Sequence, residues 1–151
     1  MKEIKFNVPF HDPKSIKNVI NFLKKKKPLH GPGKNILQIK KSIKKIFNFK
    51  SIHLTNSCTS ALEICALILN LKRNDEVILP SFSFVTTGSS FVRVGCKLRY
   101  CDIQKNNLMP SFDQIKDCVN KNTKVIVIVH YQGYSVDYLD KLKQFCLKRK
   151  I

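Results

Sequence analysis

Apolar residues recur at helical spacing in two stretches of the first third of the chain. The first stretch follows Asp12 and Pro13, a pair suited to the N-cap and the first position of a helix. In the second stretch, isoleucines share one face while lysines occupy the other. The segment 30–33, rich in Gly and Pro, lies between the two stretches and is typical of a loop. We therefore predict two amphipathic helices within residues 12–50.

From residue 52 onward, short β-rich runs alternate with helical patterns. The predicted strands are residues 52–54, 76–79, 97–101 and 124–129. The predicted helices are residues 59–71, 83–92, 112–120 and 137–150. The last strand reads KVIVIV, a continuous run typical of a parallel strand covered on both faces. The alternation predicts an α/β fold with a mostly parallel sheet and flanking helices. Because the apolar run in the first of these helices is nearly continuous, we expect that helix to be mostly buried.

The net charge favours a lysine-rich surface more than a nucleic-acid site. The chain has 28 Lys and Arg residues against 10 Asp and Glu residues, a net charge of +18. Such an excess is typical of proteins that bind nucleic acid. However, 24 of the 28 basic residues are Lys and only 4 are Arg, the residue that makes bidentate contacts with phosphates and bases. A basic α/β module that binds nucleic acid stays open as the alternative.

The cysteines and the apolar runs indicate a cytoplasmic protein without a metal site. The six cysteines stand at scattered spacings, with no C-x-x-C pair and no zinc-like arrangement with the histidines. Free thiols in a reducing compartment are the simplest interpretation. The first ten residues lack the apolar core of a signal peptide, and no apolar run reaches the roughly 20 residues that cross a bilayer. The length of 151 residues fits one globular domain that touches no membrane.

Polar residues gather where three predicted strands end. Residues 55–59 open the helix after the first strand, where free N–H groups and the helix dipole favour a phosphate. Phe84 follows the second strand among hydroxyl side chains, and His130 follows the last. Because ligands bind at the carboxyl ends of parallel strands, we expect one common site. These residues also have structural interpretations: Asn56, Ser57 or Thr59 as a helix cap, Phe84 as a core residue, and His130 as a structural histidine rather than an acid–base group.

Three segments carry a resemblance to a known family. They are Thr-Asn-Ser-Cys-Thr-Ser-Ala-Leu at 55–62, Asp-Glu-Val-Ile-Leu-Pro-Ser-Phe-Ser-Phe-Val-Thr-Thr at 75–87, and Val-His-Tyr-Gln-Gly at 129–133. In order and spacing they resemble the DegT-type family of sugar aminotransferases, which use pyridoxal phosphate (PLP) on the aspartate-aminotransferase fold, fold type I. Gln132 stands where the family usually has Ala. The resemblance runs from Phe6 to the last residue.

The resemblance implies the N-terminal part of a PLP-binding large domain, with helices in residues 12–50 and an αβ unit in residues 51–151. Cys58 and Thr59 match the pair that holds the cofactor phosphate, and Phe84 matches the aromatic residue that stacks on the pyridine ring. The implied reaction moves an amino group from glutamate to a 4-keto-6-deoxy dTDP-sugar, as in the biosynthesis of enterobacterial surface polysaccharide. The full-length family forms homodimers.

The resemblance also implies that the catalytic groups are missing. In the family, the Asp on the pyridine nitrogen and the Schiff-base Lys both come after the position matched by Ile151. We therefore expect an incomplete large domain, 1–151, that carries no catalytic residue and is inactive alone. Its sheet would end in an unpaired edge and an uncovered apolar face, both prone to aggregation. A fragment, one half of a split gene and a non-functional remnant of a decayed gene all stay open.

Overall fold

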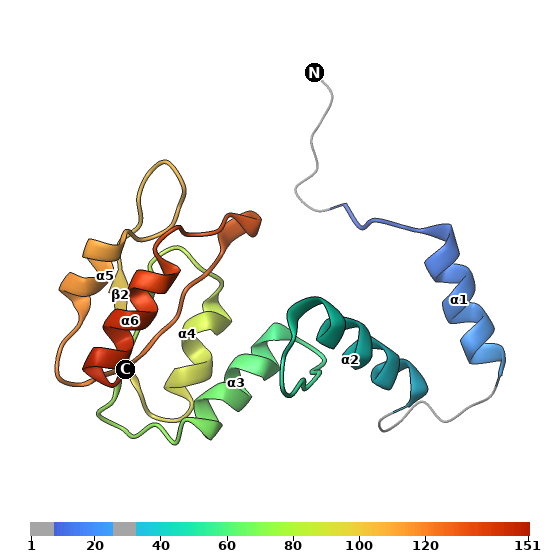
Figure 1. Ribbon diagram of the computed structural model, residues 1–151, viewed down its shortest axis with the longest axis horizontal. Coiled ribbons are helices and arrows are strands. Elements are labelled where there is room, and N and C mark those ends of the chain that lie inside the picture. The colour runs from blue at the N-terminus through green and yellow to red at the C-terminus, as the bar shows by residue number, and fades with distance from the viewer. Residues whose placement is uncertain (1–7, 26–32) are drawn as a thin grey trace. The chain divides into compact units, whose positions relative to one another are not determined.

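The computed structural model describes residues 8–25 and 33–151 and divides into two compact units, residues 1–53 and 54–151 (Figure 1). The predicted loop at 30–33 falls almost entirely outside the described residues. Along the described parts of the chain, no helix has the length and apolarity needed to cross a bilayer.

The first unit holds the two predicted amphipathic helices, α1 (Pro13–Lys24) and α2 (Lys34–Phe47). The carboxylate of Asp12 caps α1 by accepting the N–H groups of Lys14 and Ser15 at 3.2 and 2.9 Å. The hydroxyl of Ser15 also donates to this carboxylate, and these bonds hold the pKa of Asp12 below its usual value. No described residue of either helix is buried within this unit.

The second unit is built on a three-stranded parallel sheet. Its strands are β1 (Glu76–Pro80), β2 (Lys97–Cys101) and β3 (Thr123–Ile126), in the order β2-β1-β3. The α/β fold predicted from the sequence is therefore confirmed. The predicted strand at 52–54 is wrong, because a strand needs a neighbour for its N–H and C=O groups, and none of the three described strands pairs with that segment.

β3 is shorter than predicted, and Pro80 of β1 explains where it stops. The N–H of Val127 donates to the carbonyl of Ile78 at 2.8 Å, so Ile78 directs its polar groups toward β3. Residue 80 faces the same side, two positions further on. Because proline has no N–H, it cannot donate the next bond of the ladder to Val127, and the pairing ends.

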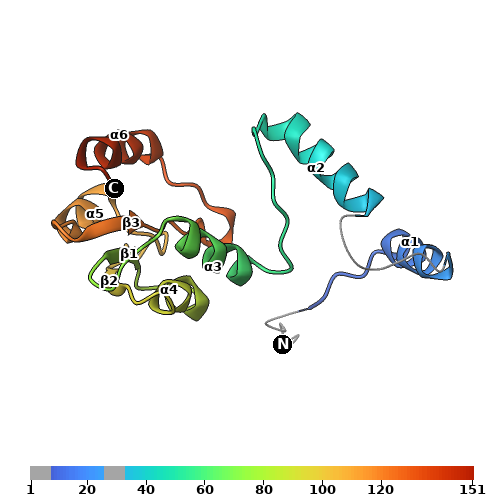
Figure 2. The same cartoon turned by 90° about the horizontal axis from the view of Figure 1, so that it is seen from below.

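Helices cover both faces of the sheet, as Figure 2 shows. α3 (Cys58–Ile68) and α4 (Val85–Val92) lie on one face, and α5 (Phe112–Cys118) and α6 (Leu139–Arg149) lie on the other. The residues of β1 alternate between two cores. The α3/α4 core contains Ala66, Val77, Phe91 and Cys96. The α5/α6 core contains Ile78, Cys101, Ile115 and Leu142.

The start of β1 is fixed by a polar cluster at the end of the strand opposite Pro80. One carboxylate oxygen of the buried Glu76 accepts from Arg99 Nε and from Asn120 Nδ2, both at 2.7 Å. The Glu76 carboxylate raises the pKa of Arg99 through this hydrogen bond. Since Arg99 lies on β2 and Asn120 just before β3, Glu76 ties the three strands together at this end.

The expectation that the first helix of the αβ unit is mostly buried is wrong. In α3 only Ala66 is buried, while the side chains of Ile64, Leu67 and Ile68 are 44%, 67% and 78% exposed. The physical reason is that α4 covers one side of α3 within this unit, and no other described helix of the unit packs extensively on it.

Candidate functional site

The start of α3 presents unpaired backbone donors. The hydroxyl of Ser57 caps the helix by accepting the N–H of Ser60 at 3.1 Å, and the carbonyl of Ser57 accepts the N–H of Ala61 at 3.2 Å. The N–H groups of Cys58 and Thr59 have no acceptor among the described residues. Two free N–H groups at the positive end of a helix dipole form an arrangement that favours an anion.

Local side-chain bonds hold the turn before α3. The hydroxyl of Thr55 donates to the carbonyl of Ser57 at 2.8 Å, and the hydroxyl of Ser60 donates to the side-chain oxygen of Asn56 at 2.8 Å. The cap interpretation is therefore correct for Ser57 but not for Thr59, whose hydroxyl makes a different contact. These two hydrogen bonds stabilise the conformation of the turn, and this conformation fixes the direction of the Cys58 and Thr59 amides.

The start of α4 lies beside the start of α3. The hydroxyl of Thr59 donates to the hydroxyl of Thr86 at 2.9 Å, which joins the first turns of the two helices. Phe84 is the N-cap residue of α4 and supplies no side-chain cap to it. The Phe84 ring is 73% exposed, so it is not part of either core. The alternative of a core role for Phe84 is therefore wrong in this structure.

The third polar segment joins the same region through an aromatic contact. The ring of Phe82 packs against the ring of Tyr131 at a centroid distance of 4.9 Å and an angle of 59°. Tyr131 opens the short 3-10 helix Tyr131–Gly133, and His130 just before it is exposed. The three segments singled out in the sequence are thus contiguous in space, linked by the Thr59–Thr86 hydrogen bond and the Phe82–Tyr131 ring contact.

Thr86 and Tyr131 are the two site residues whose roles the sequence did not reveal. The Thr59–Thr86 bond joins residues 27 positions apart, and nothing in either local pattern indicates that pairing. A hydroxyl residue in the first turn of each of two neighbouring helices is the signal that could have suggested it. The site has no acid or base whose role is fixed by its contacts. The His130 carbonyl accepts the N–H of Gly133 at 3.0 Å, and among the described residues no hydrogen bond involves the His130 side chain.

Comparison with known proteins finds similarity to one family of aminotransferases and to two curated enzymes named for nucleotide sugars. The family described as DegT/DnrJ/EryC1/StrS aminotransferases matches residues 10–151. The dTDP-4-dehydro-2,3,6-trideoxy-D-glucose 4-aminotransferase of Saccharopolyspora spinosa is 31% identical over 94 residues, which are 62% of this chain and 24% of the relative. GDP-perosamine synthase of Vibrio cholerae is 27% identical over 114 residues, 76% of this chain and 31% of the relative.

Solved structures are similar over nearly the whole chain. The PLP form of the putative sugar aminotransferase Spr1654 from Streptococcus pneumoniae gives a TM-score of 0.84 at 26% identity, over 98% of this chain and 37% of that protein. PseC of Helicobacter pylori, an aminotransferase of pseudoaminic acid biosynthesis, gives 0.82 at 27% identity, over 99% and 40%. The chain spans about a quarter to a third of the length of the curated relatives.

Proposed function

The chain belongs to the DegT/DnrJ/EryC1/StrS aminotransferase family, and from that premise we propose that it forms the phosphate-binding part of the PLP site of a nucleotide-sugar aminotransferase. PLP is the cofactor of this family, since a solved relative exists in PLP and PMP forms. The observation that carries the proposal is the pair of free N–H groups at the start of α3, held against the start of α4 by the Thr59–Thr86 bond.

The residues at the two helix starts fit the chemistry of the cofactor. A phosphate dianion binds best to convergent N–H and O–H donors at a helix N-terminus. The amides of Cys58 and Thr59 supply such donors. The hydroxyl of Thr59, whose single O–H donates to Thr86 in this structure, supplies a third donor when it turns to the phosphate. The exposed ring of Phe84 supplies an aromatic face for a flat heterocycle. When bound, PLP supplies the electron sink of amino-group transfer.

The finer features of the reaction are part of the same proposal. The names of the two curated relatives specify a dTDP-linked and a GDP-linked sugar, which supports a nucleotide sugar as the substrate. Within that class we favour a 4-keto-6-deoxy dTDP-sugar with glutamate as the amino donor, in the biosynthesis of a surface polysaccharide. The working form is a cytoplasmic homodimer.

The test is a binding experiment with pyridoxamine 5′-phosphate. This ligand has no aldehyde, so it cannot react with the many lysines, and pyridoxamine serves as the ligand without phosphate. We expect the chain to bind the phosphorylated ligand more tightly by calorimetry at physiological salt. Thr59→Val removes one charge-assisted donor, worth roughly 1.5–3 kcal/mol, so its affinity falls by roughly 10- to 150-fold.

The matched control is Ser89→Ala, which removes an exposed hydroxyl from α4 away from the first turn. It is expected to leave the affinity unchanged, and circular dichroism verifies that both variants are folded. Equal binding of pyridoxamine with and without its phosphate, or full affinity in Thr59→Val, would contradict the proposal.

A further inference from the structure

The loops that precede α5 and α6 form a pocket of about 440 Å³. Residues 102–111 follow β2, and residues 134–138 come after β3 and lead into α6. Because ligands of parallel sheets bind beyond the carboxyl ends of the strands, both loops lie where a binding site is expected. None of the residues that form the proposed phosphate site lines this pocket, so the two sites are separate.

The floor of the pocket is apolar and held in place. Met109 and Val136 line it, and they are 3% and 8% exposed. The hydroxyl of Tyr138 donates to the carbonyl of Pro110 at 2.5 Å, which joins the two loops across 28 positions of the chain. Because this bond fixes the loops before a ligand arrives, binding costs less conformational entropy.

The walls carry neutral polar side chains with unused hydrogen-bonding groups. These side chains are Gln104, Asn107, Ser111 and Ser135. Nδ2 of Asn107 donates to Oε1 of Gln104 at 3.3 Å, and Oδ1 of Asn107 accepts the N–H of Met109 at 3.0 Å. Since a carboxamide has two N–H donors, both amides keep a free donor for a ligand.

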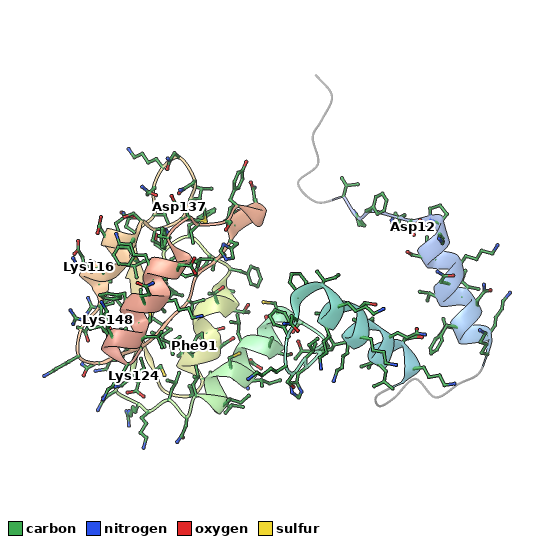
Figure 3. The ribbon with its side chains drawn as sticks, in the orientation of Figure 1. Asp12, Phe91, Lys116, Lys124, Asp137 and Lys148 are labelled. Atoms are coloured by element: carbon green, nitrogen blue, oxygen red, sulfur yellow. The ribbon has the colours of Figure 1, made fainter. Side chains whose placement is uncertain are left out.

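Asp137, which Figure 3 labels, is the one charged residue among the described residues that line the pocket. Within the described parts of the chain, no ion pair and no hydrogen bond involves its carboxylate. Lys141, four positions further on, lies over the ring of Phe112 at 4.1 Å from the ring centroid. A pocket lined by a carboxylate and by no Lys or Arg, in a chain of net charge +18, disfavours an anion and favours a cation.

A small organic cation with hydroxyl groups matches these features. Its positive group pairs with the Asp137 carboxylate in a charge-assisted hydrogen bond. Its hydroxyl groups exchange hydrogen bonds with the amides of Gln104 and Asn107, which both donate and accept. The pocket volume lies within the range of small-molecule sites, roughly 300–1,000 Å³, and is far larger than a single metal ion requires.

We propose that the pocket between the 102–111 and 134–138 loops binds a small hydroxylated primary amine in its ammonium form. The ammonium group binds Asp137 at the exposed rim, and the carbon skeleton covers the apolar floor of Met109 and Val136. This inference goes beyond the proposed function and does not depend on it, because the pocket shares no residue with the phosphate site.

The test titrates D-glucosamine into the ¹⁵N-labelled chain at slightly acidic pH, where its amine is protonated. N-acetyl-D-glucosamine is the matched ligand, because it has the same ring and a nitrogen without charge. Backbone amide shifts are followed residue by residue. We expect saturable shifts from D-glucosamine within residues 104–111 and 135–138, and binding of the N-acetyl sugar that is at least about tenfold weaker.

Asp137→Asn keeps the size of the side chain and removes its charge. We expect this variant to bind D-glucosamine at least about tenfold more weakly and to bind pyridoxamine 5′-phosphate with unchanged affinity. The matched control is Asp140→Asn, which removes an exposed carboxylate from the first turn of α6 that does not line the pocket. It should bind D-glucosamine like the original chain, and circular dichroism verifies that both variants are folded.

Equal affinity for the two sugars, or full affinity for D-glucosamine in Asp137→Asn, would overturn the proposal. Inorganic phosphate that shifts the same amides would show an anion site at the starts of α5 and α6 and would also overturn it. The same holds if D-glucosamine shifts none of these amides, or shifts those beside Asp113, Asp117 and Asp140 equally. Failure of the phosphate site is read from pyridoxamine 5′-phosphate alone and leaves this result unaffected.

Discussion

Phe84 and Phe91 lie seven positions apart, and we predict that Phe84 faces a ligand while Phe91 belongs to the core. Phe91 is 2% exposed and packs in the α3/α4 core (Figure 3), whereas Phe84 is 73% exposed. Burying a whole phenylalanine removes roughly 200 Å² from water, worth about 5 kcal/mol at ~25 cal/mol per Å². Phe84 hides only about a quarter of that area, which corresponds to roughly 1 kcal/mol at most.

We therefore expect Phe91→Ala to lower the free energy of unfolding by about 3–5 kcal/mol, a large part of the stability of an ordinary domain. Phe84→Ala should cost about 1 kcal/mol or less and instead weaken the binding of pyridoxamine 5′-phosphate. The assay is urea unfolding followed by far-UV circular dichroism, with slopes of about 1–3 kcal/mol per M. Equal destabilisation by the two substitutions would refute the reasoning, because Phe84 would then be a core residue with no free face for a ligand.

Two further predictions concern stability. Glu76→Gln should cost roughly 1.5–3 kcal/mol in urea unfolding, because it removes the charge from a buried hydrogen-bonded cluster. Glu63→Gln, at a largely exposed ion pair with Arg93, should cost less than about 0.5 kcal/mol, and equal costs would contradict this reasoning. Burial raises the pKa of the Cys101 thiol from 9.0 to about 12, so the folded state keeps its proton where the unfolded state loses it. The stabilisation that this buried thiol contributes is complete below pH 9 and is lost as the pH rises toward 12. Cys101→Ala should therefore reduce the fall in the free energy of unfolding between pH 8 and 10.5. An unchanged fall would contradict the role given to Cys101.

Sequence patterns predicted most of the helices and strands, because capping residues and apolar periodicity depend only on residues close together in the chain. The Asp12-Pro13 start and the isoleucine stripe predicted α1 and α2, and the DegT-type resemblance is confirmed by the family match. The predicted strand at 52–54 failed because pairing depends on a distant partner. The length of β3 was wrong because it is set by Pro80 on another strand, which the KVIVIV run cannot reveal.

The candidate site was predictable as a set of segments and not as a set of contacts. The start of α3 and the position of Phe84 just after a strand follow from capping residues and from a strand end, which are readable in sequence. The exposure of Phe84, in contrast, comes from the structure. The Thr59–Thr86 bond and the Phe82–Tyr131 contact depend on how the segments pack, so only the structure provides them. The burial of α3 was overestimated. Its apolar run predicts that several faces of the helix are buried, whereas the described unit buries only one face of it.

The most direct test of the central claim is to map where a phosphate binds. Pyridoxamine 5′-phosphate is titrated into the ¹⁵N-labelled chain at physiological salt, and backbone amide shifts are followed residue by residue. We expect the largest shifts at Cys58 and Thr59, and we expect them to saturate with one common dissociation constant. Shifts spread over the lysines of α2, with none at the start of α3, would contradict it and show that the anion follows the general positive charge instead.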